Sequence, residues 1–64
     1  EFVGILKQSN NPFQRRNAAY WIGELRVEFG RSALMDAAEK DPDAEVRKIA
    51  AAALAKLGKA KPEE

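Results

Sequence analysis

The sequence predicts an all-α fold, a short solenoid of about four antiparallel helices at roughly residues 2–9, 12–27, 31–40 and 42–57. Residues 14–25 and 46–57 read alike position by position, at an offset of 32 residues. A repeat period of about 20 to 50 residues is typical of stacked helical units, each of which buries its apolar face against its neighbours. Apolar residues also recur at helical spacing, and strand-like alternation persists nowhere in the sequence.

The first helix is predicted over residues 2–9, where a short apolar face is followed by a turn. That face holds Phe2, Val3, Ile5 and Leu6. Ser9-Asn10-Asn11-Pro12 then favours a turn and ends the helix.

The second helix is predicted to begin after Asn11, whose side chain can cap it, with Pro12 at the first helical position. Gln14, three residues after the cap, completes a capping-box pattern. The helix is expected to run to about Val27, because Phe29-Gly30 interrupts the pattern. Its apolar stripe is predicted to contain Gln14, Ala18, Trp21, Ile22 and Leu25.

The third helix is expected to end near Lys40, and Asp41-Pro42 repeats the earlier device of a cap followed by proline. The fourth helix is predicted to stop at Gly58. Residues 1–58 are therefore predicted to form one module of packed helices, and residues 59–64 are expected to form a polar, frayed tail. The predicted stripes are Ala33, Leu34, Ala37 and Ala38, then Val46, Ile49, Ala50, Ala53, Leu54 and Leu57.

Composition narrows the classes of function. The 64 residues include 11 Lys and Arg against 10 Asp and Glu, a formal charge of +1, which gives no strong field for nucleic acid or a membrane. With neither Cys nor His, the usual zinc, iron and copper ligand sets are absent, and no cofactor is predicted. No apolar run is long enough to cross a bilayer, so we expect a soluble protein, and the lack of Cys fits the cytoplasm.

The segment from Asp41 to Gly58 closely resembles a HEAT-like repeat of the type named after the phycobiliprotein (PBS) lyase subunits. That pattern runs Asp, a short turn, Val-Arg, an alanine-rich helix, then Leu, small, Lys, Leu, Gly. Residues 10–26 resemble a degenerate second copy, in which Gln14 replaces the Val and Asn17 replaces an apolar or small residue. The resemblance implies HEAT-like helix pairs, with one full repeat between two half repeats. Such incomplete repeats would suit a fragment, or an assembly that covers an end of the stack.

We expect the basic residues near the helix starts to have mainly structural roles. In the family that the chain resembles, the arginine near the start of the first helix pairs with acidic groups or carbonyls at the inter-repeat turn. Arg15 and Arg47 occupy that place, and Asp41 or Asp43 would suit as partners. Arg16 and Lys48, the next residues along, are expected to be solvated.

Six residues are candidates for binding a partner. Trp21 is predicted to fill the core, whereas Tyr20 is predicted to project from a polar face, where a large amphipathic ring is a suitable anchor. The resemblance implies that partners lie along the concave side, lined by the second helices. The candidates are Tyr20, Arg16, Glu24, Met35, Asp36 and Glu39.

The leading prediction is a protein interaction or scaffold module that is not an enzyme. No group of residues in the sequence resembles an active site, and the sequence has no histidine. The alternative is an accessory component of a bilin lyase-type or other enzyme complex, which rests on the family resemblance alone. Nucleic-acid binding through Arg15, Arg16, Arg31, Arg47 and Lys48 is a third reading. Self-association, or contact with further repeats, through the open ends is a fourth.

Overall fold

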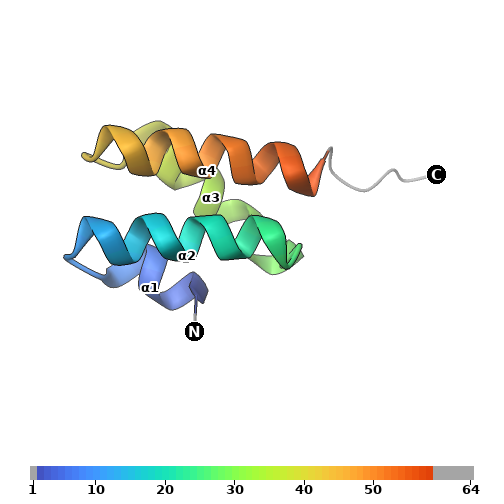
Figure 1. Cartoon of the computed structure of the whole chain (residues 1–64), viewed down its shortest axis with the longest axis horizontal. Helices are drawn as coiled ribbons and strands as arrows, with labels where there is room; N and C mark the ends of the chain where they lie inside the picture. Colours follow the sequence, from blue (N-terminus) through green and yellow to red (C-terminus); the bar gives the residue numbers. More distant parts are fainter. Residues whose placement is uncertain (1, 59–64) are drawn as a thin grey trace.

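A computed structural model describes residues 2–58 as a set of antiparallel helices (Figure 1). All regular structure in this range is helical, which confirms the predicted all-α class. The predicted tail, residues 59–64, lies outside the described residues. The elements are α1 (Phe2–Gln8), α2 (Pro12–Glu24), the 3₁₀ helix η1 (Glu28–Gly30), α3 (Arg31–Lys40) and α4 (Ala44–Leu57).

The longer helices, α2 and α4, lie side by side, and α3 lies behind them (Figure 1). The short α1 packs against α2 and α3, so each long helix is paired with a shorter one. This is the short-long, short-long order that the sequence predicts. In the described part of the chain, no helix has the length and apolar character needed to span a membrane.

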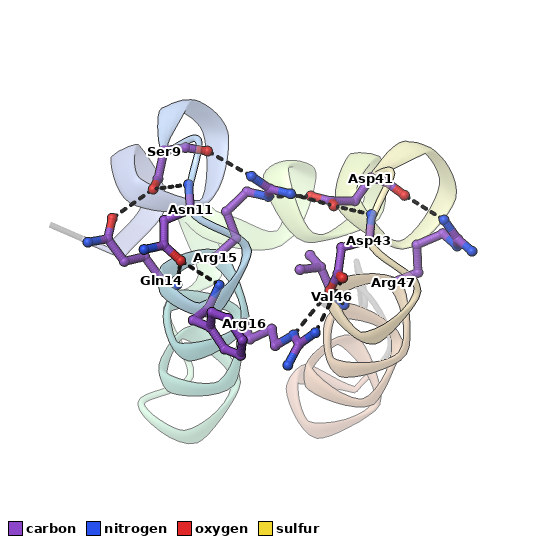
Figure 2. Close-up of polar contacts among 10 residues, drawn as sticks. Ser9, Asn11, Gln14, Arg15, Arg16, Asp41, Asp43, Val46 and Arg47 are labelled. Carbon is purple, nitrogen blue, oxygen red and sulfur yellow. Dashed lines mark hydrogen bonds and ion pairs between the residues drawn. The ribbon is translucent and has the colours of Figure 1, made fainter.

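The start of α2 is fixed by side chains in the preceding turn, as the sequence predicts. The Asn11 side-chain oxygen accepts hydrogen bonds from the backbone amides of Phe13 at 2.8 Å and Gln14 at 3.4 Å (Figure 2). The Gln14 side chain does not reach back to the Asn11 amide, as a direct capping box would require. Instead the Ser9 hydroxyl accepts from that amide and donates to Gln14, and so stands between them.

The end of α2 differs from the prediction, because the helix stops at Glu24 instead of about Val27. Arg26 takes a left-handed conformation with a φ of 54°, and its amide donates to the carbonyl of Gly23. The amide of Val27 donates to the carbonyl of Ile22. These two bonds form a Schellman motif, which is usually closed by glycine. With arginine at this position, the sequence carries no stop signal there.

The start of α4 also differs from the prediction. Asp43, not Asp41, is the N-cap, and its carboxylate accepts from the amide of Val46 at 2.9 Å. Pro42 therefore lies in the loop and not at the first helical position. The predicted stop at Gly58 is confirmed, since this residue has a φ of 77°, which favours glycine.

The core lies between the two helix layers and is rich in alanine. Its three largest fully buried side chains are Ile22, Leu34 and Val46. Small side chains let helices approach closely, and Gly23 of α2 lies directly against Ala53 of α4. A Cβ atom placed on Gly23 would lie 2.7 Å from the Cβ of Ala53. The other buried members are Leu6, Ala18, Ala19, Ala37, Ala50 and Ala53.

Candidate functional site

The turns that precede α2 and α4 meet through a polar network centred on Arg15 (Figure 2). The Arg15 Nε and Nη2 atoms donate to the two carboxylate oxygens of Asp41 at 2.9 and 3.1 Å, and Nη1 donates to the carbonyl of Ser9 at 2.9 Å. The Arg15 and Asp41 side chains are only 12% and 7% exposed. The predicted structural role of Arg15 is confirmed, because its guanidinium ties the two turns together.

Arg47 repeats one half of this arrangement. Its Nη1 donates to the carbonyl of Asp41 at 2.7 Å, as Arg15 does to that of Ser9, and both residue pairs are related by the 32-residue offset. The repeat seen in sequence is therefore also a repeat of hydrogen bonds.

Arg16, expected to be solvated and to meet a partner, is engaged within the chain. Its Nε and Nη2 donate to Asp43 at 3.1 and 3.3 Å, and its guanidinium lies 4.7 Å from the centroid of the Phe13 ring. The hydrogen bond from Arg16 holds the pKa of the Asp43 carboxyl below its ordinary value, with the amide of Val46 acting in the same direction and burial opposing both. The expectation of a solvated Arg16 is wrong, because Asp43 lies within reach across the packed helices.

An apolar groove of about 180 Å³ runs between α2 and α4. Its lining residues are Tyr20, Ile49, Ala52, Ala53 and Lys56. The groove exists because the alanine side chains of α4 are small and leave space between the helices. The Tyr20 ring of α2 borders this space.

Tyr20 and Glu24 meet at the rim of this groove through Lys56. The Lys56 ammonium forms an ion pair with Glu24 and lies 5.1 Å from the centroid of the Tyr20 ring. A cation over an aromatic face is attracted by the ring quadrupole, so Lys56 holds the tyrosine in place. Of the six predicted binding residues, only Tyr20 lines the groove. Glu24 is joined to it by Lys56, and Arg16 lies one turn before Tyr20 on the same helix.

Trp21 does not fill the core, contrary to the prediction. Its side chain is 39% exposed and packs edge-on against Tyr20, with the ring centroids 5.1 Å apart. Leu25, from the same predicted stripe, is 57% exposed. The buried face of α2 is turned away from them, toward Ala19, Ile22 and Gly23.

Comparison with known proteins adds one finding. A family model for HEAT repeats matches residues 1–64. The chain belongs to the HEAT-repeat family. Neither the curated proteins nor the solved structures include a significant match to this HEAT-repeat chain.

The three candidates on α3 of this HEAT-repeat module are exposed, but they lie apart from the groove between α2 and α4. Asp36 forms an exposed ion pair with Lys40 at 3.6 Å. It also borders a shallow recess of about 260 Å³ between α1 and α3, together with Lys7. Met35 and Glu39 are exposed on the same helix, outside the lining of either recess. The six candidates thus divide between two separate surfaces.

Most of the basic side chains proposed to bind nucleic acid form hydrogen bonds or ion pairs within the HEAT fold. Arg31 donates to Glu28 and to the carbonyl of Gly58, in addition to the pairing of Arg15 and Arg16 described above. Lys48 alone fits the expectation of solvation, with a side chain that is 75% exposed beside Glu45. Since phosphate binding needs free cations, this engagement removes most of the candidate patch.

Sequence reasoning missed the α4 side of the groove, namely Ile49, Ala52 and Lys56. Ala52 is the repeat counterpart of Tyr20, so the sequence shows that the two copies differ at this position. A single alanine, however, does not indicate a binding site. Within residues 2–58, no group of three acidic, histidine or cysteine residues is placed to hold a metal ion.

Proposed function

We propose that this HEAT-repeat chain is a non-catalytic protein-binding module that takes an apolar side chain of its partner into the groove between α2 and α4. The groove itself is the observation that carries the proposal. It joins an apolar floor to an aromatic edge and a charged rim, the combination found at the energetic centre of many protein interfaces.

The groove also suits an anchor of defined size and charge. Its volume of about 180 Å³ is enough for one leucine-sized or methionine-sized side chain. The rim is electrically balanced, because Lys56 pairs with Glu24 and Arg16 with Asp43. A neutral apolar anchor is therefore favoured over a charged one, which would enter an apolar floor without a free counter-charge.

HEAT repeats generally mediate protein interaction, and the family is typically non-catalytic, which supports this choice. The bilin lyase-type subtype and the cytoplasmic location stay predictions from the sequence. No observation on the described residues favours a tetrapyrrole or a nucleic acid over a protein partner.

The test compares two matched variants. Ala52 and Ala55 are both exposed on α4, but only Ala52 lines the groove. We expect Ala52→Glu to place a charge in the groove and abolish retention of a partner from an extract of the source organism. Ala55→Glu should retain the same protein as the unmodified chain. If no protein is retained, or if both variants retain it equally, the proposal is wrong.

A further inference from the structure

The side of α2 that faces away from α4 carries no charged residue, although 33% of the chain is charged. The three charged residues of α2 all pair toward α4 or its preceding loop: Arg15 with Asp41, Arg16 with Asp43, and Glu24 with Lys56. The opposite side, here named the amide-tryptophan face, consists of Gln14, Asn17, Trp21 and Leu25, which recur at helical spacing. All four residues are exposed.

The repeat identifies this face as one that packs against a helix. The 32-residue offset relates Trp21 to Ala53 and Gln14 to Val46. Ala53 and Val46 are 3% and 0% exposed, because that side of α4 faces α2 and the core. In the described chain, the same side of α2 is bordered only by α1, which is about half as long (Figure 1). A helix-docking face of α2 is thus left largely uncovered.

A head-to-tail stack of copies fits this face poorly. Ala53 fits against α2 only because Gly23 has no side chain, since even a Cβ atom there would lie 2.7 Å away. In a head-to-tail stack, the bulky Trp21 would occupy the place of Ala53, and Ala55 the place of Gly23. Arg47 would also meet Ser9 where Arg15 meets the carboxylate of Asp41. Both differences between the repeat copies disfavour a head-to-tail stack.

We infer that the amide-tryptophan face binds the same face of a second copy of this chain about a two-fold axis. Such an isologous contact brings each patch against itself, so a charged patch would repel its mate and an uncharged one does not. Asn17 and Gln14 each carry both a donor and an acceptor, so they can pair with their own kind. Loss of charge and gain of tryptophan are also the compositional marks of an interface centre.

The two α2 helices run antiparallel in this dimer. That direction places each α1 beside the free C-terminal half of the other α2, and it opposes the two helix dipoles. With the axis midway between Asn17 and Trp21, each indole lies over the partner's Asn17 and close to the partner's indole. Leu25 then lies near the partner's Phe13, which is also exposed.

Sedimentation velocity over a range from low micromolar to submillimolar concentration tests the dimer. Trp21 is the only tryptophan, so its emission should shift to shorter wavelength with the same concentration dependence as dimer formation. A chain that remains a monomer throughout, or one that grows into larger assemblies, overturns the inference. So does a dimer whose formation leaves the Trp21 emission unchanged.

Leu25→Glu and Met35→Glu form the matched pair, because these side chains are 57% and 51% exposed and only Leu25 lies on the face. We expect Leu25→Glu to weaken the dimer about 100-fold or more, since each dimer buries two new charges, and Met35→Glu to leave it unchanged. Asn17→Glu, which places a better helix former in the middle of α2, should act like Leu25→Glu. It tests the same face if Leu25→Glu loses helicity. Equal dimer affinities for the face variants and Met35→Glu would overturn the inference.

Discussion

The contact between Gly23 and Ala53 gives a prediction in which the sign of the effect is diagnostic. A methyl group added at Gly23 would lie 2.7 Å from the Cβ of Ala53 and 2.8 Å from its Cα. Carbon atoms pack at about 3.5–4.0 Å, so α4 must move back by about 1 Å. Because one of the contacted atoms is backbone, a side-chain rotation cannot relieve the overlap.

The expected magnitude follows from two opposed effects of Gly23→Ala. Overpacking costs about 1–3 kcal/mol, and the backbone contact favours the upper end of that range. Replacing glycine by alanine inside a helix stabilises it by about 1 kcal/mol. The free energy of unfolding should therefore fall by about 2 kcal/mol, which corresponds to about 10 °C in Tm for a domain of this size.

Urea unfolding followed by circular dichroism, at one fixed protein concentration, measures this change. Ala51→Gly serves as a calibration, because Ala51 is exposed on α4 and should report helix propensity alone, a loss of about 1 kcal/mol. Ala53→Gly added to Gly23→Ala should restore part of the loss, since it removes one of the two close atoms. If Gly23→Ala is more stable than the unmodified chain, the close approach does not limit the packing and the reasoning fails.

Two further predictions concern the turn network. Arg15→Ala should destabilise the chain by about 3 kcal/mol, because it leaves the nearly buried carboxylate of Asp41 without its cation; chemical denaturation measures this, and a loss below about 1 kcal/mol would contradict it. The lowered pKa of Asp43 means that its charge stabilises the fold above the ordinary aspartate pKa of about 3.9, and that this contribution is lost as the pH falls through the lower folded-state pKa. Asp43→Asn keeps a good N-cap but no charge, so its unfolding free energy should depend less on pH in acid than that of the unmodified chain. Identical pH profiles would show that the Arg16–Asp43 pair contributes no such linkage.

Several features of the fold could be predicted because they depend on local chemistry. The bounds of α3, the cap at Asn11 and the stop at Gly58 each follow from residues adjacent in sequence. The pairing of Arg15 with Asp41 is long-range, but the repeat resemblance gave the type of partner expected.

Other features could not be predicted because neighbours far along the chain decide them. Asp41 lies where a cap would, yet its carboxylate is held by Arg15, and Asp43 caps α4 instead. The candidate groove likewise needs α2 and α4 side by side, so Tyr20 was found from α2 alone while Ile49 and Lys56 were not.

The sequence by itself determined that residues 2–58 form four α-helices and that the chain repeats with a period of 32 residues, since helical spacing, caps and glycine stops are properties of short segments. Only the tertiary structure decided which side of α2 is buried. The predicted stripe combined Ala18 and Ile22, which are buried, with Trp21 and Leu25, which are exposed. Helical periodicity shows that a side is apolar, but burial depends on which helix covers that side. Here α4 covers the side with Gly23, where the absence of a side chain lets Ala53 approach closely.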